Sequence, residues 1–157
     1  MYIEMILLIS YNVNILSLGV YIMEIQKSRH ATHLLHAHLV FITKYKFNIL
    51  TKEHIDFLGV IFKDTLEEMG AILEEYDGEN NHVHLLILYP PKYSISSIVN
   101  NLKGRSSRLL RRDMPKVKER YWGNGSALWS RSYFAGSVGG APLEIVKQYI
   151  QQQDTPN

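Results

Sequence analysis

The stretch Asn81-His82-Val83-His84-Leu85-Leu86-Ile87-Leu88-Tyr89 places two histidines, two residues apart, at the start of an apolar run of strand length. Because side chains alternate between the two faces of a strand, His82 and His84 should point to the same face. Neutral imidazole is the commonest metal ligand in proteins, so this pair could hold one divalent ion. A His-x-His pair also occurs on ordinary protein surfaces, so the metal assignment depends on the rest of the chain.

The sequence on either side of this strand predicts alternating strands and helices. We expect strands at 36–45, 71–76, 82–89 and 132–138, and helices at 51–69, at 94–112 and from Pro142 onward. We expect Thr51 to be the N-cap of the first helix and Gly70 to end that helix. We expect Asp77-Gly78 to form the turn after the second strand. The order β-α-β-β-α-β-α predicts an α+β, ferredoxin-like (RRM-like) fold, an antiparallel sheet with helices on one face. The other face of the sheet is then open to a ligand.

Composition limits the kinds of function that remain. The chain has 157 residues, 46% of them hydrophobic and 20% charged, which is typical of one globular domain. It has no cysteine, so disulfides and thiolate metal sites are excluded, and we expect a cytoplasmic protein. The sequence contains no P-loop or dinucleotide-binding fingerprint, so we expect no nucleotide cofactor.

The first 22 residues differ from the rest of the chain because Glu4 is their only charge. The segment is long enough to span a bilayer, but it contains several polar residues and lacks the basic start of a signal peptide. We expect 1–22 to be a non-essential extension and 23–157 to be the single functional domain, with no membrane partner. A membrane anchor is the alternative.

Basic residues are concentrated in one part of the chain. The formal net charge is only +2, yet eight of the 17 lysines and arginines lie between positions 103 and 120. Such a block indicates a polyanion partner at one face, although a solvated helix face has the same composition. The candidate DNA contacts are Lys103, Arg105, Arg108, Arg111 and Arg112, supported by Lys116, Lys118 and Arg120.

The closing helix contains Tyr149 and Gln153, which are four residues apart and therefore share a helix face. Tyrosine can act as a nucleophile that forms a covalent intermediate. Its ordinary pKa is about 10, so at neutral pH it needs a strongly polarised target, which a divalent ion can provide. A lone tyrosine on a helix is more often a half-buried packing residue.

Taken together, these motifs resemble a known family. His82-Val83-His84, Lys103-Gly104, the segment Leu128-Trp129-Ser130-Arg131-Ser132-Tyr133-Phe134, and Tyr149 with Gln153 follow one another as in the single-tyrosine HUH transposases of small bacterial and archaeal insertion sequences. The resemblance runs from His36 to Gln153. It implies that His82, His84 and Gln153 bind Mg²⁺ or Mn²⁺. It also implies that Tyr149 attacks single-stranded DNA to leave a 5′-phosphotyrosine and a free 3′-OH. Members of this family act as homodimers and recognise DNA hairpins near the element ends.

Two features complicate the metal assignment. The family often carries Asp before the first histidine, where this chain has Asn81, which weakens any carboxylate contact to a ligand. His36 and His38 form a second His-x-His pair on the first predicted strand. We place the metal on His82 and His84 because only that pair has the basic helix and the tyrosine helix after it in the matching order. The resemblance implies that His38 is a strand histidine and not a ligand.

Two other functions stay open. The chain could be another HUH nickase, but relaxases carry the tyrosine ahead of the histidines and replication initiators usually carry further domains. It could also be a non-catalytic module that binds single-stranded nucleic acid, which would need exposed aromatics on the central strands, whereas 85–88 is aliphatic. Of the other aromatic residues, we expect Tyr133 to be structural, and Trp122 and Trp129 either to stack on bases or to pack in the core.

Overall fold

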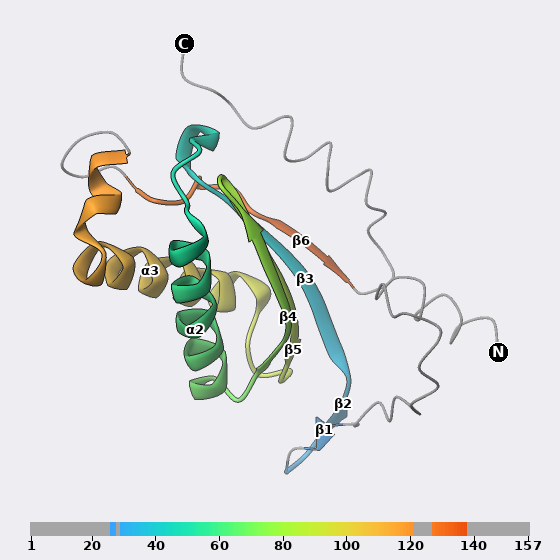
Figure 1. The fold of residues 1–157 in the computed structure, drawn as a ribbon. Helices are drawn as coiled ribbons and strands as arrows, with labels where there is room; N and C mark the ends of the chain where they lie inside the picture. Colours follow the sequence, from blue (N-terminus) through green and yellow to red (C-terminus); the bar gives the residue numbers. More distant parts are fainter. Residues whose placement is uncertain (1–25, 28, 121–126, 138–157) are drawn as a thin grey trace, which may run out of the picture.

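The computed structural model describes residues 26–27, 29–120 and 127–137 (Figure 1). The extension 1–22, its predicted boundary with the domain, and the predicted helix from Pro142 onward lie outside these residues. Within the described part of the chain, no helix is long and apolar enough to cross a membrane.

Four strands form the main sheet. They are β3 (Leu35–Ile42), β4 (Ile72–Glu79), β5 (His82–Tyr89) and β6 (Phe134–Ser137), arranged in the order β4-β5-β3-β6 with antiparallel neighbours. Helices α2 (Lys52–Glu68) and α3 (Ile95–Asp113) cover one face of this sheet (Figure 1). This arrangement confirms the predicted ferredoxin-like α+β fold.

Three shorter pieces complete the described structure. The 3₁₀ helix η1 (Lys44–Lys46) follows β3, and η2 (Pro115–Arg120) follows α3. Strands β1 (Gln26–Lys27) and β2 (Thr32–His33) form a separate two-stranded sheet that the sequence did not predict. Strands of two residues are too short to show a period of alternation, so no pattern could have indicated them.

The core lies between the sheet and the two helices. Alternate residues of the central strands point into it, and the fully buried ones pack against apolar residues of α2 and α3. The set includes Leu39, Phe41, Val83, Leu85 and Ile87 from the sheet, Leu58, Phe62 and Leu66 from α2, and Ile98, Leu102 and Leu110 from α3. Strand alternation therefore sends the intervening residues, including the histidines of β3 and β5, to the face that the helices leave open.

Helix α2 begins and ends where the sequence predicted. The Thr51 hydroxyl accepts a hydrogen bond from the His54 backbone N–H at 3.3 Å, and His54 Nδ1 accepts one from the Thr51 N–H at 3.1 Å. This reciprocal pair is a capping box with histidine in the place usually held by Glu or Gln. Gly70 follows the helix with a φ of +70°, a left-handed conformation that glycine adopts without steric cost.

The predicted turn at Asp77-Gly78 is wrong. Strand β4 continues through both residues to Glu79, and Asn80-Asn81 form the turn to β5. Gly78 pairs with Val83, and a Cβ atom at Gly78 would lie 3.0 Å from Val83 Cγ1 and 3.2 Å from Ile55 Cγ2. The glycine is therefore needed for close packing between the strand and α2, and not for a turn.

Candidate active site

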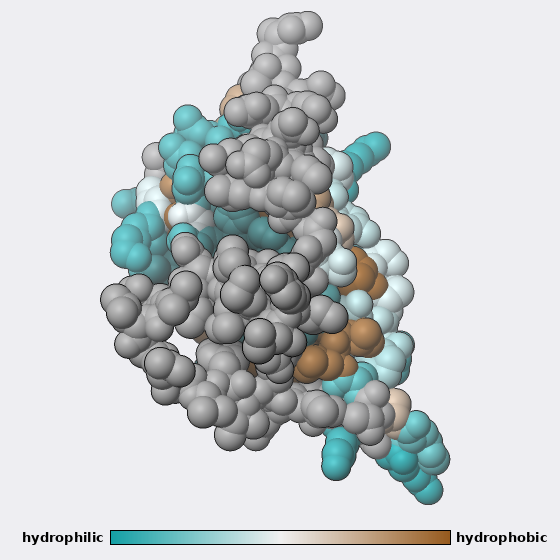
Figure 2. All heavy atoms as spheres, turned by 90° about the vertical axis from the view of Figure 1, so that its right-hand side faces the viewer, coloured by the Kyte–Doolittle hydropathy of each residue, from teal (hydrophilic) through white to brown (hydrophobic). Residues whose placement is uncertain are grey.

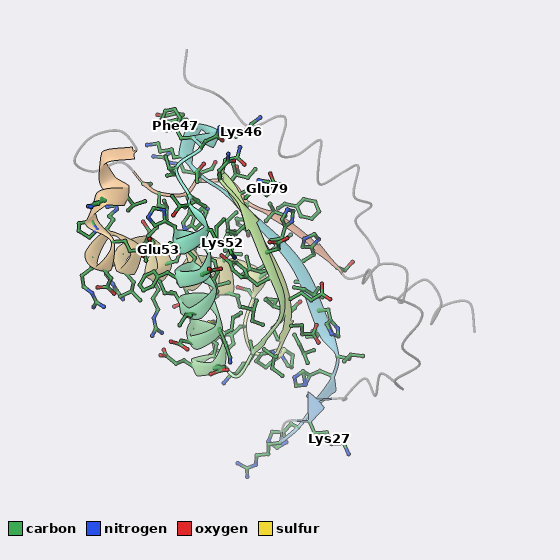
Figure 3. All side chains as sticks on the ribbon, in the orientation of Figure 1. Lys27, Lys46, Phe47, Lys52, Glu53 and Glu79 are labelled. Atoms are coloured by element: carbon green, nitrogen blue, oxygen red, sulfur yellow. The ribbon has the colours of Figure 1, made fainter. Side chains whose placement is uncertain are left out.

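His82 and His84 lie side by side on the open face of the sheet. Their ring centroids are 4.9 Å apart, while Val83 between them is fully buried on the helix side. The pair stands at the end of the sheet where the Asn80-Asn81 turn leads into β5, next to Glu79 at the end of β4 (Figure 3). Two imidazoles at this spacing can turn one nitrogen each toward a shared ion.

Hydrogen bonds fix which nitrogen each ring can offer. His82 Nδ1 lies 2.7 Å from Asn81 Oδ1, and because a carbonyl oxygen only accepts, Nδ1 carries the proton. His84 Nδ1 lies 3.2 Å from Nε2 of His38 on the neighbouring strand. Both contacts engage Nδ1, so Nε2 is the nitrogen that each ring could turn toward an ion, in His84 only when Nδ1 is the donor to His38. Asn81 thus supplies, as an amide, the hydrogen bond that Asp often provides in the resembling family.

The surroundings keep these histidines neutral. Burial, together with the neighbouring rings of His82 and His38, lowers the pKa of His84 to about 4. Burial also lowers the pKa of His82, against the opposing effect of Glu79 and Asp77, and it lowers the pKa of His38. A neutral imidazole is the form that binds metal, so the donor chemistry fits a divalent ion.

The described residues supply only two of the three predicted ligands. Within 26–27, 29–120 and 127–137, no group of three or more His, Cys, Asp or Glu side chains could hold a metal ion. Gln153, the third predicted ligand, and Tyr149, the predicted nucleophile, both lie outside these residues. The structure therefore shows that His82 and His84 lie together, and the roles of all four predicted site residues stay predictions.

The competing pair His36 and His38 does not converge on a point of its own. His36 Nε2 contacts the Glu74 carboxylate at 3.1 and 3.2 Å. His38 instead turns to His84, and its ring packs edge-on against Phe134 with a centroid distance of 6.1 Å. The two rings thus have separate partners.

The predicted DNA contacts lie mostly on α3, on the opposite side of the sheet from the histidines (Figure 1). Arg108, Arg111 and Arg112 line a shallow open depression of about 490 Å³ together with Gly104 and Ser107. Arg105 makes a bidentate ion pair with Glu68 of α2, in which its two terminal nitrogens donate to the two carboxylate oxygens at 2.5 and 2.9 Å. Arg112 makes a similar pair with Asp113 at 2.5 and 2.8 Å.

The remaining basic residues of this block lie on η2. Lys116 is exposed there, and Lys118 and Arg120 belong to the same short helix. Five of the described basic residues are called the basic face below: Arg105, Arg108, Arg111, Arg112 and Lys116.

Lys103 has a different environment from the other basic residues. Its Nζ donates to the backbone carbonyls of Ser130, Arg131 and Ser132 at 2.5, 3.3 and 3.2 Å. Burial lowers its pKa, and its Nζ also lies 5.8 Å from the centre of the Tyr133 ring. The sequence did not suggest this role, because nothing local indicates that a helical lysine will bond to a loop more than 25 residues away.

The segment 128–132, which leads into β6, is held by hydrogen bonds to the end of β3 and to α3. The Lys44 N–H donates to Leu128 O and the Ser130 N–H donates to Ile42 O, both at 2.8 Å. On the helix side, buried Trp129 donates through Nε1 to Ser106 Oγ at 2.9 Å, so Trp129 is a core residue. Strand β6 begins at Phe134, two residues later than predicted, and the Ser132 carbonyl at the predicted start accepts a hydrogen bond from Lys103.

Comparison with known proteins matches this arrangement to one family. The family model described as IS200-like transposase matches residues 31–153. This chain belongs to the IS200-like transposase family. The match covers most of the chain and agrees with the single-tyrosine HUH resemblance that the sequence motifs indicated.

Individual relatives agree with the family match. The chain is 31% identical over 131 residues to the ISDra2 transposase TnpA of Deinococcus radiodurans, covering 83% of this chain and 92% of the relative. It is also 31% identical over 116 residues to the transposase for insertion sequence element IS200 of Salmonella typhimurium, with 74% of each protein covered. A solved crystal structure of a candidate transposase from Deinococcus radiodurans superposes with a TM-score of 0.73 at 30% identity, covering 83% of this chain and 99% of that one. The IS200-like chain is therefore a transposase, an enzyme that acts on DNA.

Proposed function

We propose that this IS200-like transposase cleaves and rejoins single-stranded DNA at insertion-sequence ends through a 5′-phosphotyrosine on Tyr149. His82 and His84, with Gln153 as a third ligand, would hold a divalent ion. The observation that carries this proposal is the pair of neutral imidazoles side by side on the open sheet face, each with its Nδ1 in a hydrogen bond.

The proposed reaction keeps the energy of the phosphodiester bond. The Tyr149 oxygen forms a bond to phosphorus and loses its proton to water. The bond from phosphorus to the 3′-oxygen of the preceding nucleotide breaks, and this oxygen takes a proton from water to leave as the 3′-OH. A 3′-OH then attacks the phosphotyrosine, and the tyrosine oxygen leaves. When bound, a divalent ion draws charge from a phosphate oxygen, which favours attack by a weak nucleophile. Two nitrogen ligands suit Mn²⁺ better than Mg²⁺, which prefers oxygen.

The basic face has a separate task in this proposal. It lies on the helix side of the sheet, so DNA bound there would not occupy the histidine face. We propose that the basic face binds hairpins at the element ends, while the open sheet face receives the strand to be cut. We leave Lys103 out of this face, because its ammonium group already bonds to three carbonyls. We also propose that the chain acts as a homodimer.

One experiment tests the nucleophile. Wild type, Tyr149→Phe and Tyr133→Phe are incubated with end-labelled single-stranded DNA from the element ends and Mn²⁺, and denaturing gels report covalent adducts. We expect an adduct in wild type and Tyr133→Phe and none in Tyr149→Phe. Tyr133 is a suitable control because it is half-buried against the core and next to Lys103.

The opposite pattern of adducts would move the nucleophile to Tyr133. If wild type forms no adduct with the correct DNA ends, the non-catalytic binding module becomes the better account of the chain.

A further inference from the structure

His38 and His84 share a single proton between two ring nitrogens. They are diagonal neighbours on the open face, since His84 pairs with Val40 and His38 with Leu86. His38 Nε2 and His84 Nδ1 are 3.2 Å apart, and the two rings are tilted by 30° with centroids 5.5 Å apart. The distance fits one N–H···N hydrogen bond, in which one nitrogen donates and the other accepts.

The direction of this hydrogen bond decides whether His84 can bind a metal. A neutral imidazole carries one N–H and one lone pair. If the proton is on His84 Nδ1, the lone pair of His84 is on Nε2, where a metal can take it. If the proton is on His38 Nε2, then His84 Nδ1 accepts it, His84 Nε2 carries the other proton, and His84 cannot act as a ligand.

We propose that His38 is a positioning residue that accepts the Nδ1–H of His84 and so presents the Nε2 lone pair of His84 on the open face. The neighbouring ring shows the same design, because the Asn81 amide oxygen accepts the Nδ1–H of His82 at 2.7 Å. Partners of this kind fix both the tautomer and the orientation of a histidine ligand. The proposal goes beyond the proposed function, on which it rests only for the identity of the ligand pair.

His36 provides a matched control on the same strand and face. It lies two residues before His38, yet its Nε2 contacts the Glu74 carboxylate and not a proposed ligand. Replacing His36 therefore removes an imidazole from the same sheet face and leaves the His84 contact in place. A glutamine at position 38 offers a second comparison, because its amide oxygen can accept a hydrogen bond from about the position of the histidine Nε2.

The test measures metal affinity and tautomer on the full-length protein. Mn²⁺ is titrated into wild type, His38→Leu, His38→Gln and His36→Leu, and free Mn²⁺ is read by electron paramagnetic resonance. We expect His38→Leu to weaken Mn²⁺ binding about 10–100-fold. His38→Gln should recover most of that loss, and His36→Leu should bind as wild type does. Circular dichroism checks that each variant is folded, and the tautomer of His84 in wild type, measured by NMR, decides the question if His38→Leu is not.

Nitrogen-15 NMR of the metal-free protein gives an independent result. We expect His84 to carry its proton on Nδ1 in wild type and to shift toward the Nε2–H form in His38→Leu. Unchanged Mn²⁺ affinity in folded His38→Leu, or an Nε2–H form of His84 in wild type, would overturn the proposal. If wild type binds no Mn²⁺, the metal site of the proposed function fails, while the NMR result still decides the role of His38.

Discussion

At the scale of single residues, the buried histidines make the stability of the fold depend on pH. The pKa values of His38, His82 and His84 are lowered in the folded protein, that of His84 to about 4. Between the unfolded value of about 6.5 and the folded values, the unfolded chain binds more protons. The free energy of unfolding is therefore not reduced by these histidines above about pH 6.5, and it falls as the pH drops from 6.5 toward 4.

Urea denaturation at pH 7.5 and pH 5.0 measures this loss of stability. His84→Gln removes the most strongly shifted group, so its stability should fall less than that of wild type between the two pH values. An equal fall in both proteins would mean that other groups, such as carboxylates, cause the pH dependence.

Two helical glycines should respond in opposite ways to alanine. A Cβ at Gly59 in α2 would lie 2.8 Å from Cε1 of Tyr76, whose hydroxyl is anchored to Ile55 O at 2.8 Å. Gly59→Ala should therefore destabilise the fold by about 1–3 kcal/mol through overpacking. A Cβ at Gly104 in α3 would meet nothing within 4 Å, so Gly104→Ala should stabilise by about 1 kcal/mol through helix propensity.

Thermal or urea denaturation of the two glycine variants reports both changes. A stabilised Gly59→Ala would mean that Tyr76 can move aside, and that the close approach of α2 to β4 does not constrain the helix.

At the scale of elements, the ion pair between α2 and α3 should limit DNA binding by the basic face. Glu68 holds Arg105 with two hydrogen bonds, so a phosphate has to compete with a carboxylate for that guanidinium. Glu68→Gln should release Arg105, tighten DNA binding, and steepen the log–log salt slope by about 0.9 on a duplex stem. Fluorescence anisotropy at several salt concentrations measures both effects.

Glu67→Gln is the matched control for Glu68→Gln. It removes the same charge one residue earlier, from a carboxylate that pairs with Lys63 at 3.9 Å and not with Arg105. An equal increase in DNA affinity from both variants would show that net charge, and not the release of Arg105, causes the effect.

Lys103 links α3 to the segment that leads into β6. Replacing it tests whether this lysine stabilises the fold or contacts DNA. Lys103→Met keeps most of the aliphatic stem but leaves the carbonyls of Ser130, Arg131 and Ser132 without their donor. We expect a loss of about 1–3 kcal/mol in the free energy of unfolding. The salt slope of DNA binding should stay unchanged, whereas Arg108→Met should flatten it. A flattened slope in Lys103→Met would return Lys103 to the basic face.

The elements that the sequence predicted well are those with a local signal. Helix α2 has a cap at Thr51, an apolar stripe and a stop at Gly70, and strand β5 has the apolar run 85–89 after its two histidines. The errors occurred where distant parts of the chain decide the outcome. Asp77-Gly78 has turn composition, yet packing against Val83 and Ile55 keeps it in a strand. The segment before β6 bonds through its carbonyls to Lys103, which is far away in the sequence.

At the scale of the whole molecule, the sheet separates two kinds of chemistry. One side carries α2, α3 and the basic face, and the other carries the histidines; Figure 2 looks onto this second side, where hydrophobic and hydrophilic side chains of the described residues are both visible. Sequence alternation predicted that His82 and His84 share a face. It could not predict that the basic residues of α3 lie on the opposite side, since this follows from which face of the sheet the helices cover.

This separation predicts that DNA binding and strand cleavage can be removed independently. Arg108→Ala combined with Lys116→Ala should weaken hairpin binding and flatten the log–log salt slope, by about 0.9 for each phosphate of a duplex stem that the variant no longer neutralises. The same variant should still form the covalent adduct on a short single strand at saturating concentration, because the histidine face is intact. His84→Ala should do the reverse, since it removes a proposed metal ligand but no residue of the basic face. Anisotropy on the hairpin and denaturing gels on the short strand measure the two activities separately.

Lys52→Ala serves as the control for general loss of positive charge, because its side chain is 88% exposed on α2 and pairs with Asp56. If the arginine–lysine variant also loses adduct formation on the short strand while Lys52→Ala does not, the cleaved strand must itself bind to α3 or η2, and the division of the molecule into two DNA faces is wrong.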